Sequence, residues 1–149
     1  MVNKNYVQVT KSATFEMAHA LDTSMGKCAN IHGHSYKLWI TIGGTIDKEN
    51  NKNIVIDFRT LKELIYSTII EKYDHSFVLF KNKKNEALKQ HLESLGFQNI
   101  ILLPFQPTTE NLTQHFVSCL QEVLPPDITL EKLRLQETEN SYAEWDFRG

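Results

Sequence analysis

Two histidines separated by one residue follow a cysteine in the stretch Cys28-Ala29-Asn30-Ile31-His32-Gly33-His34. From position 32 to position 42, the even-numbered residues are histidine or apolar, which predicts a half-buried strand with both imidazoles on its apolar side. A neutral imidazole there needs a partner for each ring nitrogen, and two imidazoles on one face of a strand can converge on a single cation. Zinc is the natural candidate for that cation.

A third histidine, His19, ends an earlier stretch of the same kind. Odd positions within residues 7–19 are mostly apolar and the even positions from 8 to 16 are polar, so His19 closes the buried face of a long predicted strand. A hairpin through the polar residues 21–27 would bring it beside His32 and His34. Three histidines match a catalytic zinc site, because structural zinc usually has four protein ligands. For His19 alone, a hydrogen-bonded core histidine is an equally good interpretation.

Cys28 lies next to this predicted metal site and has three possible roles. It could be a fourth zinc ligand, a buried apolar residue, or a catalytic thiolate whose pKa is lowered by the metal and by Lys27. The residues alone do not decide whether Cys28 is a zinc ligand or a catalytic thiolate. The other cysteine, Cys119, is expected to pack in the core, and a reducing compartment favours two free thiols over a disulfide.

Three acidic or basic side chains at the ends of predicted elements are further candidates. Asp74 and His75 follow a predicted helix, and a carboxylate beside an imidazole can fix its tautomer for acid–base catalysis. Glu137 follows two apolar residues on the inward face of a predicted strand. A carboxylate there must be paired, protonated or used to bind something, and a ligand with adjacent N–H donors would satisfy it.

Composition limits the class of protein. The chain has 149 residues with 41% hydrophobic content, which is enough for one domain over residues 1–149. The net charge is −2 and the pI is near 6.3, with basic residues scattered, so no nucleic-acid partner is expected. No apolar run reaches the length of a membrane span, and the N-terminal residues lack the apolar core of a signal peptide. We therefore expect a cytoplasmic protein with no membrane contact.

The elements that position these residues can be read from capping and periodicity. Asp57 is expected to cap a helix running to about Lys72, and Thr108 to cap a second helix with Glu110 in its first turn. Between these two helices we expect a small helix over residues 86–95, before Gly96, and a short strand over residues 99–103. Gly43 and the following residues are expected to form an exposed turn. Two strands end the chain. This order predicts an α+β fold with helices on one face of an antiparallel sheet.

Six motifs taken together resemble the 6-pyruvoyl-tetrahydropterin synthase and 6-carboxytetrahydropterin synthase family. They are Phe15-Glu16-Met17-Ala18-His19, Cys28 with His32-Gly33-His34, Val55-Ile56-Asp57-Phe58, Tyr73-Asp74-His75, Pro107-Thr108-Thr109-Glu110-Asn111 and Glu137-Thr138. The resemblance implies a T-fold, in which subunits join their sheets into a barrel. It also implies a homo-oligomer, a trimer or a hexamer, with active sites between subunits.

The resemblance assigns roles residue by residue. The family's zinc ligands fall on His19, His32 and His34, and its catalytic cysteine falls on Cys28. Its proton-transferring pair falls on Asp74 and His75, and its pterin-anchoring glutamate on Glu137. Thr109 and Glu110 match the helix-start motif near the pterin pocket. Lys27 could contact a triphosphate or could simply be solvated.

The three-residue gap between Cys28 and His32 resembles the bacterial 6-carboxytetrahydropterin synthases of the queuosine pathway. The implied reaction of that lyase takes 7,8-dihydroneopterin triphosphate and water to 6-carboxy-5,6,7,8-tetrahydropterin, acetaldehyde and triphosphate. One alternative is a 6-pyruvoyl-tetrahydropterin synthase, which eliminates triphosphate without cutting the side chain. Another is a non-catalytic T-fold protein that binds a pterin. An inserted segment over about residues 81–103 is longer than the minimal family pattern.

Overall fold

Two long strands form the centre of the molecule, as the alternating pattern predicts. The computed structural model describes residues 3–149, apart from the side chains of residues 23–25. Strands β1 (Tyr6–His19) and β2 (His32–Thr45) pair antiparallel along their whole length, from Tyr6 opposite Thr45 to His19 opposite His32. A short 3₁₀ helix, η1 (Thr23–Ala29), connects them. The predicted hairpin is confirmed, and it places His19 and His32 side by side.

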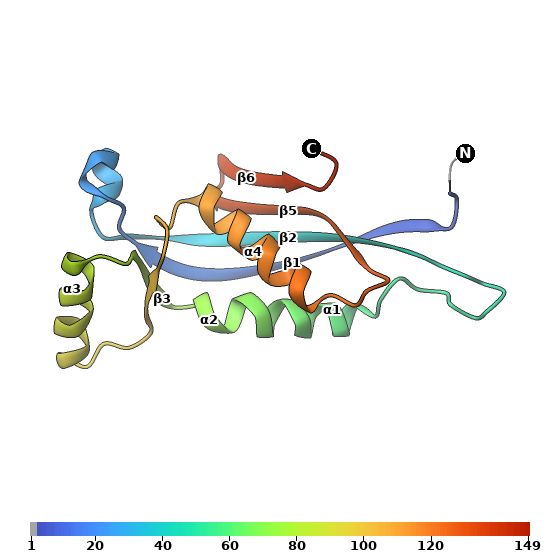
Figure 1. Ribbon diagram of the computed structural model, residues 1–149, viewed down its shortest axis with the longest axis horizontal. Coiled ribbons are helices and arrows are strands. Elements are labelled where there is room, and N and C mark those ends of the chain that lie inside the picture. The colour runs from blue at the N-terminus through green and yellow to red at the C-terminus, as the bar shows by residue number, and fades with distance from the viewer. Residues whose placement is uncertain (1–2) are drawn as a thin grey trace.

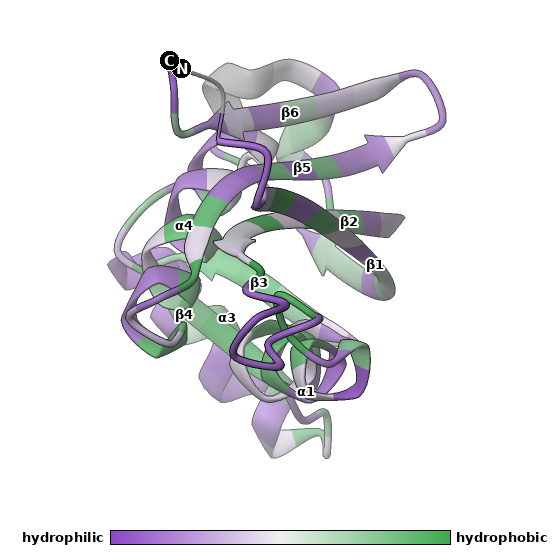
Figure 2. Cartoon of the chain, turned by 90° about the vertical axis from the view of Figure 1, so that its right-hand side faces the viewer, coloured by the Kyte–Doolittle hydropathy of each residue, from purple (hydrophilic) through white to green (hydrophobic). Residues whose placement is uncertain are grey.

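Four shorter strands complete one sheet in the order β4-β3-β1-β2-β5-β6. The four are β3 (Ser76–Phe80), β4 (Ile100–Leu103), β5 (Thr129–Thr138) and β6 (Ser141–Asp146). Strand β5 pairs antiparallel with β2, and β6 antiparallel with β5. Residues of opposite hydropathy alternate along β5, as Figure 2 shows, so one face of this part of the sheet is apolar.

The sheet is mixed, so the expectation of a purely antiparallel sheet is wrong at one edge. Strand β3 runs parallel to the last residues of β1, and β4 runs parallel to β3. Helix α3 (Lys83–Ser94) connects β3 to β4, so that β4 can run beside β3 in the same direction. A helical crossover of this kind joins parallel strands, whereas a tight turn joins antiparallel ones. The α+β expectation itself is confirmed.

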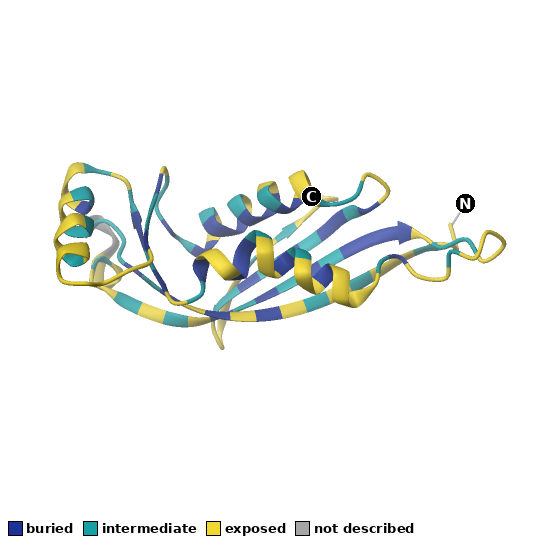
Figure 3. Cartoon of the chain, turned by 90° about the horizontal axis from the view of Figure 1, so that it is seen from below, coloured by how far each residue is buried: buried dark blue, intermediate teal, exposed yellow. Residues whose placement is uncertain are grey.

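Two helical segments cover one face of the sheet (Figures 1 and 3). The first runs through α1 (Phe58–Ile65), a π-helical turn η2 (Tyr66–Ile70) and α2 (Glu71–Tyr73), and ends within two residues of its predicted end. The second is α4 (Thr109–Val123). The predicted caps are confirmed, because Asp57 accepts from the backbone N–H groups of Arg59 and Thr60, and Thr108 from that of Asn111.

The aromatic core between helices and sheet ends at the histidines. Phe15 on β1 stacks on Tyr36 of β2 with ring centroids 5.1 Å apart, and Phe116 of α4 meets Phe15 edge to face. The next inward positions along the same strands are Met17, paired with His34, and then His19, paired with His32. The histidines therefore continue the buried face of the sheet beyond its apolar part.

Gly43 and Gly44 belong to strand β2, so the expectation of an exposed turn there is wrong. Both are buried. A Cβ atom on Gly43 would lie 2.7 Å from the carboxylate of Glu131 and against the hydroxyl of Tyr6. Glycine is needed here because two side chains approach the backbone closely, rather than because the chain turns.

The inserted segment contains the predicted helix and strand. Helix α3 begins three residues earlier than expected because Asn82 caps it, accepting from the N–H of Asn85. It ends before Gly96, whose φ of +94° is the left-handed conformation that glycine adopts at helix ends. Strand β4 then follows at residues 100–103. None of the helices within residues 3–149 combines the length and apolar character that a membrane crossing requires.

Replacing Asp57 with alanine should lower the free energy of unfolding by about 1 kcal/mol, because two N–H groups of α1 lose their acceptor. Urea denaturation followed by circular dichroism measures the change. Glu63→Ala is the matched control, an exposed acidic residue of the same helix that caps nothing. Equal destabilisation in the two variants would show that the cap contributes nothing specific.

Candidate metal centre

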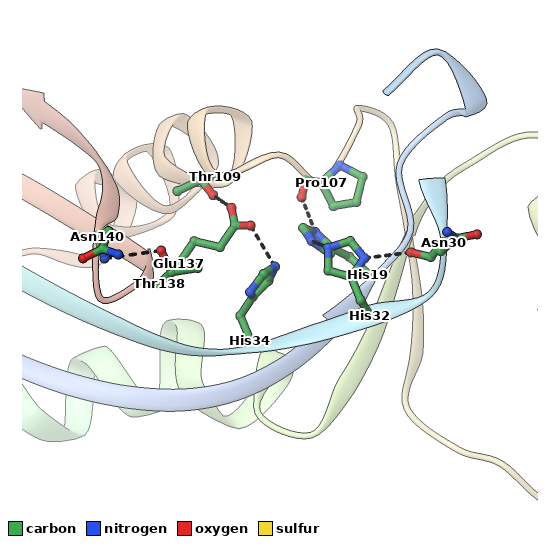
Figure 4. Close-up of polar contacts among 9 residues, drawn as sticks. All are labelled: His19, Asn30, His32, His34, Pro107, Thr109, Glu137, Thr138 and Asn140. Carbon is green, nitrogen blue, oxygen red and sulfur yellow. Dashed lines mark hydrogen bonds and ion pairs between the residues drawn. The ribbon is translucent and has the colours of Figure 1, made fainter. Parts of the chain in front are cut away.

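Three histidines meet at one end of the sheet, as Figure 4 shows. The buried His19 and the half-buried His32 have their Nε2 atoms 3.0 Å apart. The ring of His34 stands nearly perpendicular to both, with centroids 5.3 Å from His19 and 5.0 Å from His32. The long β1–β2 hairpin fixes this arrangement. Its register places His19 opposite His32, and it places His34 opposite Met17, two residues before His19 on β1.

Two backbone carbonyls fix the tautomers of His19 and His32. The Nδ1 atom of His19 lies 2.8 Å from the carbonyl oxygen of Pro107, and that of His32 lies 2.7 Å from the carbonyl oxygen of Asn30. A carbonyl only accepts, so each Nδ1 carries the proton and each Nε2 presents a lone pair. Two lone pairs facing each other at 3.0 Å repel unless a cation lies between them.

The third imidazole also presents an unsatisfied nitrogen. The Nε2 atom of His34 is buried and has no directed hydrogen bond, although Oε1 of Glu137 lies 2.7 Å from it as a charge contact. Ligand atoms of the three histidines and Glu137 all lie within 4.8 Å of one another. Three imidazole nitrogens that converge beside a carboxylate fit a metal ion. The structure therefore brings the three predicted ligands together with Glu137 in one cluster, and metal binding by this cluster stays a prediction.

Burial keeps these imidazoles in the form that binds metals. Desolvation lowers the pKa of His19, and it is opposed by the hydrogen bond to Pro107. Desolvation also lowers the pKa of His34, against the attraction of the Glu137 carboxylate. Because a metal binds only the neutral imidazole, both shifts favour metal binding at neutral pH.

The metal-free protein should lose stability as the pH falls below about 6.5, the ordinary histidine pKa. In the unfolded chain the imidazoles take up protons at that pH, whereas burial delays protonation of His19 and His34 in the folded protein to lower pH. The unfolded state then binds more protons throughout this window, so unfolding becomes easier as the pH falls. Urea denaturation at stepped pH measures the loss.

Metal should move this loss to lower pH, because it competes with protons for the Nε2 atoms. Burial also lowers the pKa of His115, so a His115→Gln variant separates the contribution of that residue. Metal-free stability that stays constant from pH 7 to pH 5 would contradict the expected titration.

Glu137 lies on the inward face of β5, as predicted, and joins the histidine cluster to α4. Its Oε2 atom accepts a hydrogen bond from the hydroxyl of the buried Thr109, in the first turn of that helix (Figure 4). The structure therefore brings Glu137 and Thr109 together. Glu110 is exposed one residue further along α4, and no contact ties it to Glu137.

Tyr36 is a member of this region that sequence reasoning assigned only to the core. Its ring packs edge-on against His34, with centroids 5.6 Å apart, and its hydroxyl is fully buried with no hydrogen-bond partner among the described residues. Burial, and then the nearby charge of Glu137, raises the pKa of this phenol. The signal in the sequence was its even position, two residues after His34, because even-numbered residues of this strand face inward.

Asp74 and His75 contact each other but do not belong to the histidine cluster. The Oδ1 atom of Asp74 lies 3.0 Å from Nδ1 of His75, whose side chain is 78% exposed. The same oxygen accepts from the N–H of Glu16, and this bond, opposed by partial desolvation, holds the pKa of Asp74 below its usual range. His75 lines a cavity of about 610 Å³ together with Glu16, Ser35 and His34. Glu16 and Ser35 bond to each other and alternate along β1 and β2 with the inward-facing residues.

Cys28 and Lys27 are both exposed on η1. Cys28 is a free thiol two residues before Asn30, whose carbonyl orients His32. Cys119 is also a free thiol, half-buried on α4 and 3.6 Å from Nε2 of His115. The expectation of two free thiols is confirmed, and the roles of Cys28 and Lys27 stay predictions.

The model of the family described as 6-pyruvoyl tetrahydropterin synthase matches residues 8–147 of this sequence. The chain belongs to this family. A curated relative from Haemophilus influenzae, named 6-carboxy-5,6,7,8-tetrahydropterin synthase, is 34% identical over 143 residues, covering 93% of this chain and 97% of that protein. A relative from Pongo abelii, named 6-pyruvoyl tetrahydrobiopterin synthase, is 29% identical and covers 90% of this chain and 87% of that protein.

The fold agrees with solved structures of the 6-pyruvoyl tetrahydropterin synthase family. The Caenorhabditis elegans 6-pyruvoyl tetrahydropterin synthase superposes with a TM-score of 0.69 at 22% identity, covering 98% of this chain and 99% of that one. The Plasmodium falciparum 6-pyruvoyl tetrahydropterin synthase superposes equally well at 21% identity, covering 95% and 98%. The predicted T-fold is confirmed, and so is the expectation that the chain is an enzyme of this family.

Proposed function

We propose that this protein is a zinc-dependent lyase that converts 7,8-dihydroneopterin triphosphate and water to 6-carboxy-5,6,7,8-tetrahydropterin, acetaldehyde and triphosphate, as a step of queuosine biosynthesis. Support comes from the relatives named 6-carboxy-5,6,7,8-tetrahydropterin synthase, which match along most of the chain. The observation that carries the proposal is the convergence of three Nε2 atoms beside a half-buried carboxylate.

His19, His32 and His34 would hold the zinc ion through their Nε2 atoms, since the carbonyls of Pro107 and Asn30 already take the Nδ1 protons of the first two. Three nitrogen ligands suit a catalytic ion better than a structural one, because a structural site usually has four protein ligands. When bound, zinc acts as a Lewis acid that polarises a coordinated oxygen of the substrate. The protein residues then have to hold the pterin and move protons.

Glu137 is the proposed pterin anchor. A pterin ring presents an amino group and a neighbouring ring N–H, and a carboxylate accepts such a pair with both of its oxygens. The hydroxyl of Thr109 already donates to one oxygen of Glu137 and fixes its direction. Partial burial strengthens these bonds because little water competes for them. Glu110 and Lys27 stay as proposed neighbours of the pterin and the triphosphate.

Cys28, His75 and Asp74 are the proposed groups for proton transfer. Asp74 is ionised at neutral pH, and the Glu16 N–H lowers its pKa further. It lies beside Nδ1 of His75, so the Nε2 atom of His75 is left to exchange protons. The thiol of Cys28 is free and exposed, so no disulfide prevents it from giving up and regaining a proton.

The position of the acid–base pair favours an active site shared between subunits. In one chain, the exposed His75 side chain pairs with Asp74, and no hydrogen bond or ion pair among the described residues joins it to the histidine cluster. We propose that His75 serves the cluster of a second copy. The sheet offers edges for assembly, since β3 covers only Met17–His19 of β1, and β6 is the last strand on the other side. Joining such edges would close a barrel in a trimer or a hexamer.

The proposal also treats residues 1–149 as one T-fold domain that works in the cytoplasm. The single six-stranded sheet supports the first part. The two free thiols support the second, since exposed thiols persist in reducing compartments.

A product assay on zinc-loaded protein tests the reaction. Incubation with 7,8-dihydroneopterin triphosphate should release acetaldehyde and triphosphate in equal amounts, and mass spectrometry should find the 6-carboxy product. Triphosphate without acetaldehyde would instead identify a 6-pyruvoyl-tetrahydropterin synthase, the activity in the name of the Pongo abelii relative. Pterin binding with an intact triphosphate would indicate a non-catalytic protein.

Replacing Glu137 with glutamine should weaken pterin binding by about 10- to 100-fold, because a charge-assisted hydrogen bond is worth about 1.5–3 kcal/mol. Fluorescence titration with a dihydropterin measures the affinity, and Glu139→Gln, an exposed neighbour, is the control. Zinc content should not change. A variant that loses zinc but still binds the pterin would show that Glu137 is a fourth metal ligand.

A further inference from the structure

The turn that carries Asp74 and His75 is held in an uncommon backbone conformation. The φ angle of His75 is +59°, in the left-handed region that residues other than glycine seldom adopt. Its N–H donates to the carbonyl oxygen of Glu16 at 2.6 Å, and this bond ties the turn to β1. Because the His75 side chain is 78% exposed, the backbone of the turn largely decides where the imidazole points.

Asn99, in the inserted segment just before β4, holds this turn from the other side. Its side-chain Nδ2 donates to the carbonyl oxygens of both Asp74 and His75, at 3.3 Å each. Its own carbonyl oxygen accepts from the N–H of Phe77 at 3.1 Å. One residue of the insertion therefore contacts the backbone of both members of the pair and of the strand that follows.

The chemistry of asparagine suits this position in two ways. Its φ is +62°, and asparagine is among the few residues other than glycine that tolerate the left-handed region. Its amide has two N–H groups, which match two carbonyl oxygens that can only accept. An aspartate of the same shape would place an oxygen against both carbonyls.

The same insertion also lines the space into which His75 opens. Leu92 from α3, with Phe97 and Gln98 from the loop after it, lines the cavity that contains His75. The segment over residues 81–103 thus both borders this cavity and, through Asn99, holds the turn at its edge.

We infer that Asn99 is a positioning residue that fixes the orientation of the Asp74–His75 pair. The consequence for catalysis rests on the proposed function, in which this pair moves protons. Displacement of a proton-transferring group by a fraction of an ångström slows turnover without altering how the substrate binds.

Two variants that keep the backbone conformation test this inference. Asn99→Gly removes the side-chain amide, and Asn99→Asp replaces its N–H donors with an oxygen. Glycine and aspartate both tolerate a positive φ. Asn51→Gly is the matched control, because Asn51 has a φ of +61° in a loop far along the chain from this turn. If Asn99→Asp fails to fold, Asn99→Gly carries the test.

The primary measurement is the amide hydrogen exchange of His75, whose N–H is bonded to Glu16. Exchange should be about tenfold faster in Asn99→Gly and faster still in Asn99→Asp, with no change in Asn51→Gly, because local opening exposes the amide. Equal exchange of His75 in wild type and Asn99→Gly would overturn the inference, whatever the enzyme activity.

Steady-state kinetics supply the second measurement. In Asn99→Gly the kcat should fall about tenfold, with KM, zinc content and melting temperature unchanged. A faster exchange with an unchanged kcat would overturn the link to catalysis. If the wild-type protein lacks lyase activity while exchange still responds to Asn99, the proposed function fails and the positioning role of Asn99 stands.

Discussion

A Cys28→Ser protein is expected to fold, to keep its zinc and to lose turnover by about 10²- to 10⁴-fold, the usual contribution of a group that transfers protons. A serine hydroxyl has nearly the size of a thiol but is far less acidic, so it supplies almost no anion at neutral pH. Cys28 is exposed on η1, so the substitution disturbs no packing. Acetaldehyde release and metal analysis on the same sample measure both effects.

Cys119→Ser is the matched control for this variant. Cys119 is also a free thiol, but it is half-buried on α4 beside His115, away from the proposed chemistry. It should keep nearly full turnover. If Cys28→Ser loses zinc and stays folded, Cys28 is a metal ligand, and the proton-transfer role proposed for it is wrong.

Replacing His34 with alanine should weaken zinc binding by about a thousandfold and abolish turnover, because two imidazole nitrogens do not hold the ion as three do. His34 contributes a buried nitrogen that faces the cluster, so its removal deletes a metal contact together with the contact to Glu137. Metal content after dialysis against a weak chelator measures the loss.

His91→Ala serves as the control, since His91 is exposed on α3. That variant should retain zinc and activity. A His34→Ala protein that still carries one zinc ion per chain would show that the metal lies elsewhere or that Glu137 replaces the missing ligand. Combining the change with Glu137→Gln separates these two cases.

Much of the fold could be predicted because its determinants are local. Period-2 alternation located β1, β2 and β5, and side-chain caps at Asp57 and Thr108 located the two main helices. The parallel pairing of β3 and β4 could not be predicted in this way. Their alternation and length do not record which neighbour each strand pairs with, because the partner strand lies elsewhere in the chain.

The candidate site could likewise be predicted only in part. Parity alone placed His19, His32, His34 and Glu137 on one buried face, because side chains in a strand alternate strictly. Their mutual contacts required the register of three strands and the start of α4. The carbonyls of Pro107 and Asn30, which orient two imidazoles, could not be identified from residue type, since every residue has a carbonyl.

The sequence by itself determined which residues carry the chemistry and which face of each strand they occupy, because those properties depend on residue type and on a period of two. Only the tertiary structure decided that Glu137 meets His34 and Thr109, that Asp74 and His75 lie outside the histidine cluster, and that Asn99 holds their turn. These contacts join residues far apart in the chain, and they form only when the helices and the inserted segment pack against the sheet.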